Sequence, residues 1–476
     1  MDKRQENPVC ISAVLCLSAL LAACQPAAPN ATATTDAESR YTGVDDAAET
    51  VEDAPRRYPA ALAGQAMLPF DSRLQMPADL PSSMRLSGKF THPELEVLTA
   101  AGEFATASFG SHPAAPRLTA VRLPIEGQAL QGFSGMAALD DGTFIVTLDN
   151  GFGTRSNSRD TLLAFARLSF NWQTGAVNVL SQSPLHDPDG VLPFEIVNRD
   201  TQPRYLTGGD LDPESIQLVG SDVFIGEEFG PFLLRADLDG RITGFYEARL
   251  GDTLIRSKSD NPLADAGVAR NLHGGSRGFE GMALSSDRRT LYLMLEGPLA
   301  DPTTLTPERL DGQAVLRILL FDTLEQRFSA DSYRYRLEEP GNNIGDFNFI
   351  SEHEALVIER DSGEGDASLA CGDTVSSDCF HEPARFKRVY KVSFAGLKSG
   401  DPVRKLAYID LLDIRDGDTR FTFPFVTIEN VVPVDDDHLI VANDNNFGFS
   451  VGRTLGQNDD NEFVLIEAVE FLRVTH

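Results

Sequence analysis

Residues 278–297 read GFEGMALSSDRRTLYLMLEG, and this stretch decides the fold that the sequence predicts. Its second half, Thr290–Leu295, is a short run of apolar, aromatic and β-branched side chains of the kind that forms a buried strand. The first half begins with a glycine-flanked phenylalanine and glutamate. We therefore expect a β-hairpin that starts near Glu280 and ends at Glu296.

The same pattern recurs at four other places in the chain. Each unit has a polar or acidic residue, then a hairpin, then an acidic or amide residue 13 to 16 positions further on. The marker residues, at intervals of 80, 66, 66 and 83, are Ser134, Glu214, Glu280, Asp346 and Glu429. Repeats of this size built from short strands predict a β-propeller.

The predicted fold class is all-β, because the chain after its N-terminal segment has no long amphipathic helical period. We expect six four-stranded blades, the sixth formed by pairing the segment near 85–125 with the C-terminal segment 462–474. Two β-sandwiches are the alternative. Sandwiches do not need the same acidic residue in every unit, so the propeller is favoured.

Acidic residues at equivalent points of the blades are expected to converge at one mouth of the central channel. The candidate metal ligands are Asp149, Glu214, Glu227, Glu228, Glu280, Glu296, Asp346, Glu359, Glu429 and Asp444. So many carboxylates in one place predict a hard cation such as Ca²⁺, with amide oxygens from Asn150, Asn430 and Asn443 as further donors. The alternative is that each acid only caps a turn within its own blade.

Basic residues accompany the acids, and arginine can bind phosphate or carboxylate with two parallel hydrogen bonds. The candidates for binding a substrate are Arg155, Arg277, Lys387 and Arg453, and those for catalysis are Glu227, Glu280, Arg155, His273 and Arg360. The alternative is that these bases only neutralise the acids around them.

Five segments resemble the phytase-like family, which is described as having esterase-like activity. They are 132–155, 226–231, 278–282, 358–361 and 387–391, and the resemblance extends over roughly residues 110 to 470. It implies an exported protein similar to β-propeller phytases, in which Ca²⁺ at an acidic channel mouth holds phosphate and activates water. The ligand motifs of the true phytases are not found in this sequence.

Three functions are consistent with these patterns. The first is a Ca²⁺-dependent hydrolase of a small phosphoester or carboxylic ester. The others are a non-catalytic propeller that binds a ligand or protein of the cell envelope, and a propeller lactonase or sugar dehydrogenase. Residues 274–278, GGSRG, also match the serine-esterase elbow, which needs a strand before it and a helix after it.

The N-terminus predicts an exported lipoprotein. Residues 11–23 are an apolar run too short to span a bilayer, and residues 21–24, LAAC, resemble a bacterial lipobox with Cys24 as the lipidated residue. An ordinary secretory signal is the alternative. Gln25 favours sorting to the outer membrane of a Gram-negative cell. We expect a signal peptide at 1–24, a disordered acidic tether at 25–80 and the phytase-like domain at 81–476.

Charge and cysteine content limit the partners. The formal charge of -30, from 41 basic and 71 acidic residues, argues against nucleic acid and against contact with membranes other than through the lipid anchor. Two of the five cysteines lie within the signal peptide and a third is Cys24. The remaining pair, Cys371 and Cys379, is expected to form a disulfide, and a metal site is the weaker alternative.

Overall fold

The hairpin at residues 278–297 forms in the computed structural model, where β13 (Phe279–Leu284) pairs antiparallel with β14 (Thr290–Leu295). The structure describes residues 54–80, 108–122, 125, 127–263, 271–301 and 303–475. They belong to one unit, Asp53–His476. The predicted signal peptide, Cys24 and the first part of the predicted tether lie outside the described residues.

Similar groups of four antiparallel strands recur along the chain, and we call each group a blade. The first blade consists of β3 (Phe133–Ala138), β4 (Phe144–Leu148), β5 (Ala164–Asn171) and β6 (Ala176–Pro184). The second consists of β7 (Pro213–Val219), β8 (Asp222–Glu227), β9 (Phe232–Ala236) and β10 (Ile242–Glu247). The third consists of β13, β14, β16 (Gln313–Asp322) and β17 (Arg327–Arg336).

The last two blades are built in the same way. The fourth consists of β18 (Asn343–Phe349), β19 (Glu354–Arg360), β20 (Lys387–Ser393) and β21 (Arg404–Asp410). The fifth consists of β24 (Ile428–Pro433), β25 (His438–Asn443), β26 (Asn461–Glu467) and β2 (Ala61–Leu68).

Short elements extend or connect the blades. They are β1 (Arg56–Arg57) beside β21, β11 (Arg249–Leu250) with β12 (Thr253–Leu254), β15 (Arg309–Leu310) beside β16, β22 (Ile414–Asp416) with β23 (Thr419–Phe421), the 3-10 turn η2 (Ala367–Leu369) and the helix α2 (Val469–Leu472). Within the described part of the chain, no helix is long and apolar enough to cross a membrane.

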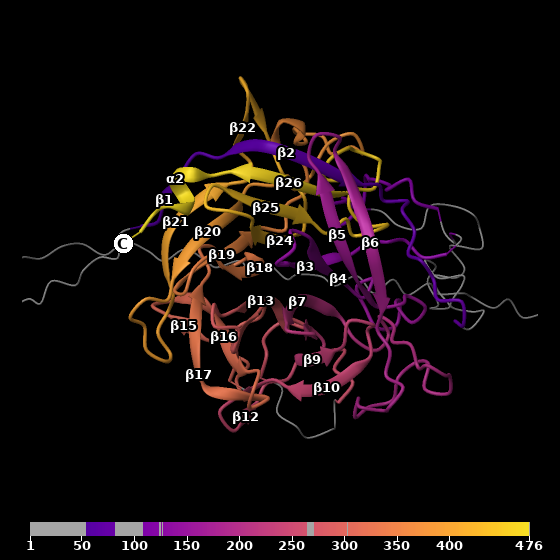
Figure 1. Cartoon of the computed structure of the whole chain (residues 1–476). Helices are drawn as coiled ribbons and strands as arrows, with labels where there is room; N and C mark the ends of the chain where they lie inside the picture. The colour runs from indigo at the N-terminus through magenta and orange to yellow at the C-terminus, as the bar shows by residue number, and fades with distance from the viewer. Residues whose placement is uncertain are drawn as a thin grey trace, which may run out of the picture. The chain divides into compact units, whose positions relative to one another are not determined.

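The first strands of the blades form a closed ring. Each packs against the first strand of the next blade, in the order β3, β7, β13, β18, β24 and back to β3 (Figure 1). An apolar core fills the space between each pair of neighbouring blades, so the two faces of every blade are covered. The all-β propeller that the sequence predicts is therefore confirmed.

The described strands form five blades, so the predicted count of six is not confirmed. The C-terminal strand β26 does not open a sixth blade. It pairs with β25 on one side and with β2 on the other, so the N-terminal strand closes the fifth blade. The segment predicted to pair with it was near 85–125, and residues 85–107 of that segment lie outside the described residues. Because β2 falls within the predicted tether, ordered structure begins earlier than the expected boundary at residue 81.

Candidate functional site

Each first strand carries a β-bulge near its start, and these bulges set the site. In β7 the extra residue is Glu214, in β13 it is Glu280 and in β24 it is Glu429. The bulge in β18 contains Asp346. A bulge leaves one residue outside the ladder and re-aims its side chain. The repeated marker of the sequence is therefore a repeated backbone irregularity.

The first blade has a glycine at the bulge, and packing explains why. Gly135 has a φ of +75°, and a Cβ atom built on it would lie 2.6 Å from the Cα atom of Ser215 in the next blade. No side chain can project from this point without moving the neighbouring blade. The bulge residue is consequently acidic in the second, third and fifth blades, whereas the bulge residue of the first blade has no side chain.

A second ring of side chains follows the second strands. In four blades, one residue lies directly after the position that pairs with the first residue of the first strand. In the fourth blade the corresponding residue follows the partner of Ile344, the second residue of β18. These equivalent residues are Asp149, Glu228, Glu296, Arg360 and Asp444. Four blades thus supply a carboxylate here, and the fourth blade supplies an arginine.

The two rings meet in a pocket of about 180 Å³, which we call the acid pocket. Its lining residues are Asp149, Asn150, Gly153, Asp212, Glu214, Glu228, Glu280, Glu296, Arg360, Glu429, Asp444 and Asn446. Seven of the ten predicted metal ligands are among them. Equivalent blade positions therefore do bring acids from separate units to one place.

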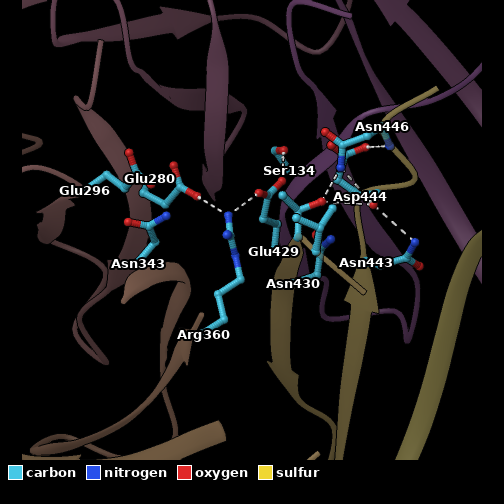
Figure 2. A network of polar contacts seen from close by, with 12 residues as sticks. Ser134, Glu280, Glu296, Asn343, Arg360, Glu429, Asn430, Asn443, Asp444 and Asn446 are labelled. Atoms are coloured by element: carbon cyan, nitrogen blue, oxygen red, sulfur yellow. Dashed lines mark hydrogen bonds and ion pairs between the residues drawn. The ribbon is translucent and has the colours of Figure 1, made fainter. Parts of the chain in front are cut away.

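Among the described residues, Arg360 is the one basic residue that lines the acid pocket. Its Nη2 atom donates a hydrogen bond of 2.9 Å to Glu429 Oε1 and lies 4.0 Å from Glu280 Oε1 (Figure 2). Glu429 also accepts a hydrogen bond of 2.7 Å from the hydroxyl of Ser134. The guanidinium thus lies between bulge acids of two different blades and holds their orientation.

The second blade brings three carboxylates closest together. One carboxylate oxygen each from Asp212, Glu214 and Glu228 lies within 4.8 Å of the other two. Asn150 donates to Asp212 from its backbone N at 3.0 Å and from Nδ2 at 2.5 Å, which fixes that side chain. This acidic cluster could hold a metal ion.

The electrostatics of the acid pocket favour protonation or a bound cation. Burial raises the pKa of several pocket carboxyls, and repulsion between neighbours raises it further. The groups whose pKa is raised well above the ordinary value are Asp149, Glu214, Glu228, Glu280 and Asp444. Burial also raises the pKa of Asp212 to about 6. At neutral pH these carboxyls cannot all be ionised without a compensating charge.

Three predicted ligands do not line the acid pocket. Glu227 accepts hydrogen bonds from the backbone N–H groups of Asp212, Phe229 and Gly230, so it caps its own turn. Glu359 accepts from the hydroxyl of Tyr335 and from Asn342 and pairs with Lys405. Both glutamates lie one residue before the ring position, and side chains alternate between the two faces of a strand.

The third of these acids, Asp346, is buried between the first strands. It accepts hydrogen bonds from the backbone N of Val431 and from Asn348. Of the amide candidates, Asn150 lines the acid pocket, whereas Asn430 donates to Phe133 O and Asn443 to Asp460 O. Asp346, Asn430 and Asn443 therefore form hydrogen bonds with backbone groups of the blades.

Most predicted basic residues have partners away from the acid pocket. Arg155 donates to the backbone carbonyls of Gly209 and Asp260, and His273 is exposed. Arg277 donates to Glu296 Oε2 at 2.9 Å and therefore contacts the lining of the pocket from outside.

The other two bases are paired with acids that do not line the acid pocket. Lys387 is buried beside Asp361, and burial lowers its pKa to about 8. Arg453 forms two hydrogen bonds with Glu462. Neither side chain lines the acid pocket.

Two further sequence features are resolved by the described residues. The GGSRG stretch lies in a turn directly before β13, so a strand rather than a helix follows it, and Ser276 donates to Ser259 O. A serine-esterase elbow is not formed. Cys371 and Cys379 are joined by a disulfide, with Cα atoms 4.9 Å apart.

Sequence reasoning missed Asp212 and Asn446 as pocket residues. Asp212 lies directly before β7 and pairs through its backbone carbonyl with the N–H of Glu228. Asp212 could have been identified from the expected pairing of the residue before β7 with the end of β8. Asn446 follows Asp444 by two residues and donates its backbone N–H to that carboxylate at 2.8 Å.

The ring of blades with an acid-lined mouth defines a hydrolase-like β-propeller. The chain belongs to the phytase-like family, described by the esterase-like activity of phytase, and the family profile matches residues 128–447. The match covers all five first strands and both rings of pocket residues. The resemblance drawn from the sequence is therefore confirmed.

Other comparisons add little beyond the fold. No curated protein matches the chain. Solved structures similar to it include a luciferin-regenerating enzyme (11% identity, 70% of this chain and 77% of that chain, TM-score 0.31). A second is the PQQ-bound aldose sugar dehydrogenase from Streptomyces coelicolor (12% identity, 71% of this chain and 95% of that chain, TM-score 0.29). A third is the glutaminyl cyclase of Myxococcus xanthus (8% identity, 71% of this chain and 92% of that chain, TM-score 0.32). Similarity at this level carries no argument about function.

Proposed function

We propose that this protein is a Ca²⁺-dependent hydrolase that cleaves a phosphoester or a carboxylic ester at the acid pocket. The observation that carries the proposal is the convergence of eight carboxylates and a single arginine in one pocket of about 180 Å³. Isolated turn-capping acids would not meet at one point from four different blades. Membership of the phytase-like family supports the same reaction class.

The charge of the acid pocket requires a cation before an anionic ester can enter. With all groups ionised, eight carboxylates and one guanidinium carry a formal charge of -7. A phosphate or carboxylate would be repelled by this field. A bound divalent ion reverses the local sign and removes the mutual repulsion that raises the pKa of these carboxyls.

The donor set fits Ca²⁺. All candidate donors are carboxylate or amide oxygens, and the closest group is Asp212, Glu214 and Glu228 with Asn150 beside it. Hard cations prefer oxygen ligands, and Ca²⁺ accepts six to eight of them in adaptable geometry. When bound, Ca²⁺ would supply a water of lowered pKa and would polarise the scissile ester group.

Side chains of the acid pocket would bind the substrate and transfer the proton. Arg360 would donate to an anionic oxygen of the substrate, since its guanidinium lies at the pocket and Glu429 and Glu280 fix it there. Burial is the main cause of the raised pKa of Glu280, so this carboxyl is suited to hold a proton at its oxygen and transfer it to a leaving group.

The sequence supports an exported, lipid-anchored location for this activity. The apolar run at 11–23 and the lipobox-like residues before Cys24 favour lipidation, and Gln25 favours the outer membrane of a Gram-negative cell. We propose that the acidic segment after Cys24 separates the propeller from the membrane surface.

Turnover of generic esters tests the function. The purified protein would be assayed with p-nitrophenyl phosphate and p-nitrophenyl acetate, with Ca²⁺ and with excess EGTA. We expect hydrolysis of at least one ester that EGTA abolishes, and a large loss of rate in Glu228→Gln. Ca²⁺ binding without turnover of either ester would instead support a non-catalytic binding propeller.

A further inference from the structure

We infer that Phe109, stacked on Phe449, forms a binding subsite beside the acid pocket for an aromatic or other flat apolar group of the substrate. This inference rests on the proposed function and specifies its substrate class. The acid pocket has room for about six water molecules at about 30 Å³ each, so it can hold ions and the acidic part of an ester but little more. The rest of a substrate must therefore lie on the surface around the mouth.

The surface at this point carries an aromatic cluster. The rings of Phe109 and Phe449 are stacked, with centroids 5.2 Å apart and planes inclined by 12°. Phe449 also meets the buried ring of Phe152 edge to face at 6.4 Å. Phe109 is 56% exposed, and among the exposed large apolar side chains of the described residues it is the one aromatic ring. An exposed flat ring backed by a second ring can stack with a third.

The cluster is continuous with the acid pocket. Phe152 directly precedes Gly153, which lines the pocket, and Phe449 donates its backbone N–H to the carbonyl of Asn446, another lining residue. Gln131 connects the two sites, because it donates to Asp149 Oδ1 and accepts from the backbone N of Phe447. A substrate held in the pocket would therefore extend over this side of the mouth, between the loops of the first and fifth blades.

Hydrogen bonds and a salt bridge hold the segment that carries Phe109 in place. Its backbone N–H donates to Phe449 O at 2.9 Å. The preceding residue, Ser108, accepts from the buried side chain of Arg117, which also forms a salt bridge of 2.8 Å with Glu364 and donates to Cys379 O. Since Cys379 is bonded to Cys371, the segment that carries Phe109 is attached through Arg117 to the loop that the disulfide closes. A pre-positioned ring loses little conformational entropy when it binds a ligand.

The chemistry of the two sites selects an ester with one anionic end and one flat apolar end. Aryl phosphates have this form, whereas a fully hydroxylated or polyphosphorylated ring has no apolar face for Phe109. Stacking of two rings contributes enough for about a threefold to tenfold change in affinity.

Two non-hydrolysable phosphonates test the subsite. Phenylphosphonate and methylphosphonate would be titrated calorimetrically into the full-length protein in the presence of Ca²⁺. We expect phenylphosphonate to bind about threefold to tenfold more tightly. Phe109→Ala should remove this difference and leave the affinity for methylphosphonate unchanged, and Phe109→Tyr should keep it. Leu238→Ala, at an apolar side chain of similar exposure (51%) in the turn between β9 and β10, should also keep it.

The outcomes separate the subsite from the function on which it rests. If both phosphonates bind with equal affinity, or if Phe109→Ala weakens both by the same factor, the subsite does not exist while the proposed function stands. If neither phosphonate binds, the proposed function fails and the subsite fails with it. If Phe109→Ala strengthens phenylphosphonate binding, the ring covers the pocket rather than binding the substrate, and the inference is overturned.

Discussion

Replacing Asp212 with asparagine is expected to stabilise the calcium-free protein at about pH 8 and to destabilise it by about 1 kcal/mol at about pH 4. Burial raises the pKa of this carboxyl from its ordinary 3.8 to about 6. The folded protein therefore binds this proton more tightly than the unfolded chain does. The protonated form contributes its full stability below about pH 4. This contribution decreases as the pH rises from about 4 to about 6 and is absent at higher pH.

The magnitude follows from the size of the pKa change. A rise from 3.8 to about 6 corresponds to about 3 kcal/mol of lost stability in the wild type at high pH. The asparagine variant avoids this loss because it carries no charge. Asp212 accepts two hydrogen bonds from Asn150, and a carboxamide oxygen keeps one of them, so the substitution costs about 1 kcal/mol in return. The net gain at about pH 8 should therefore be about 2 kcal/mol.

The assay is urea unfolding of the wild type and Asp212→Asn in excess EGTA, over a series from about pH 4 to about pH 8. The matched control is Asp252→Asn, at an exposed aspartate between β11 and β12, which should show no such dependence. A free energy of unfolding in the wild type that is constant or rises over this range would refute the reasoning. So would an asparagine variant that is no more stable than the wild type at about pH 8.

The remaining predictions concern the cation, the disulfide and the lipid. Ca²⁺ at one hundred times its dissociation constant should raise the free energy of unfolding by about 2.7 kcal/mol, and Glu280→Gln should reduce this gain while Glu49→Gln should not; a melting temperature indifferent to Ca²⁺ and chelator excludes the site. Replacing Cys371 and Cys379 by serine should cost about 2–3 kcal/mol, measured by urea unfolding, and two reactive thiols in the native wild type would contradict the bond. Cys24→Ser should abolish metabolic lipid labelling and release the protein from membranes, whereas a wild type without acyl mass would exclude lipidation.

The hairpins and the convergence of the acids could be predicted from sequence because both follow from local patterns. A short apolar run bounded by glycine and acidic residues specifies a strand wherever it occurs, and its repetition specifies equivalent blades. The exact ligands could not be predicted from the same patterns. Glu227 and Glu228 are adjacent in the sequence, yet one caps a turn and the other lines the acid pocket. Side chains alternate between the two faces of a strand, so a shift of one residue decides which glutamate faces the mouth, and residue type does not reveal that register.

Closure of the ring was less predictable because it depends on a contact between distant segments. β2 and β26 pair although they begin 400 residues apart, at Ala61 and Asn461. The strand β2 reads ALAGQAML, and its small residues resemble those of the segment before it more than those of a central strand. Such a strand forms only because β26 offers a free edge. The same limit applies to the bases, since Lys387 and Arg453 each pair with an acid that is near in space and unpredictable in sequence.

The asymmetry of the acid pocket explains how one site can hold both a cation and an anion. Arg360 occupies in the fourth blade the position that is acidic in the other four. In a ring of five blades, the fourth lies across the mouth from the junction of the first and second. That junction carries Asp149 and the cluster of Asp212, Glu214 and Glu228, where the carboxylates are closest together. A cation is therefore favoured on one side of the mouth and an anionic oxygen on the other, and an ester bound between them would have its leaving group directed outward. Five identical acidic blades could hold cations equally well but would have no place for the substrate's own charge. Under the proposed function, the single exception in the repeat is therefore the feature that makes a ring able to hold a metal a candidate hydrolase.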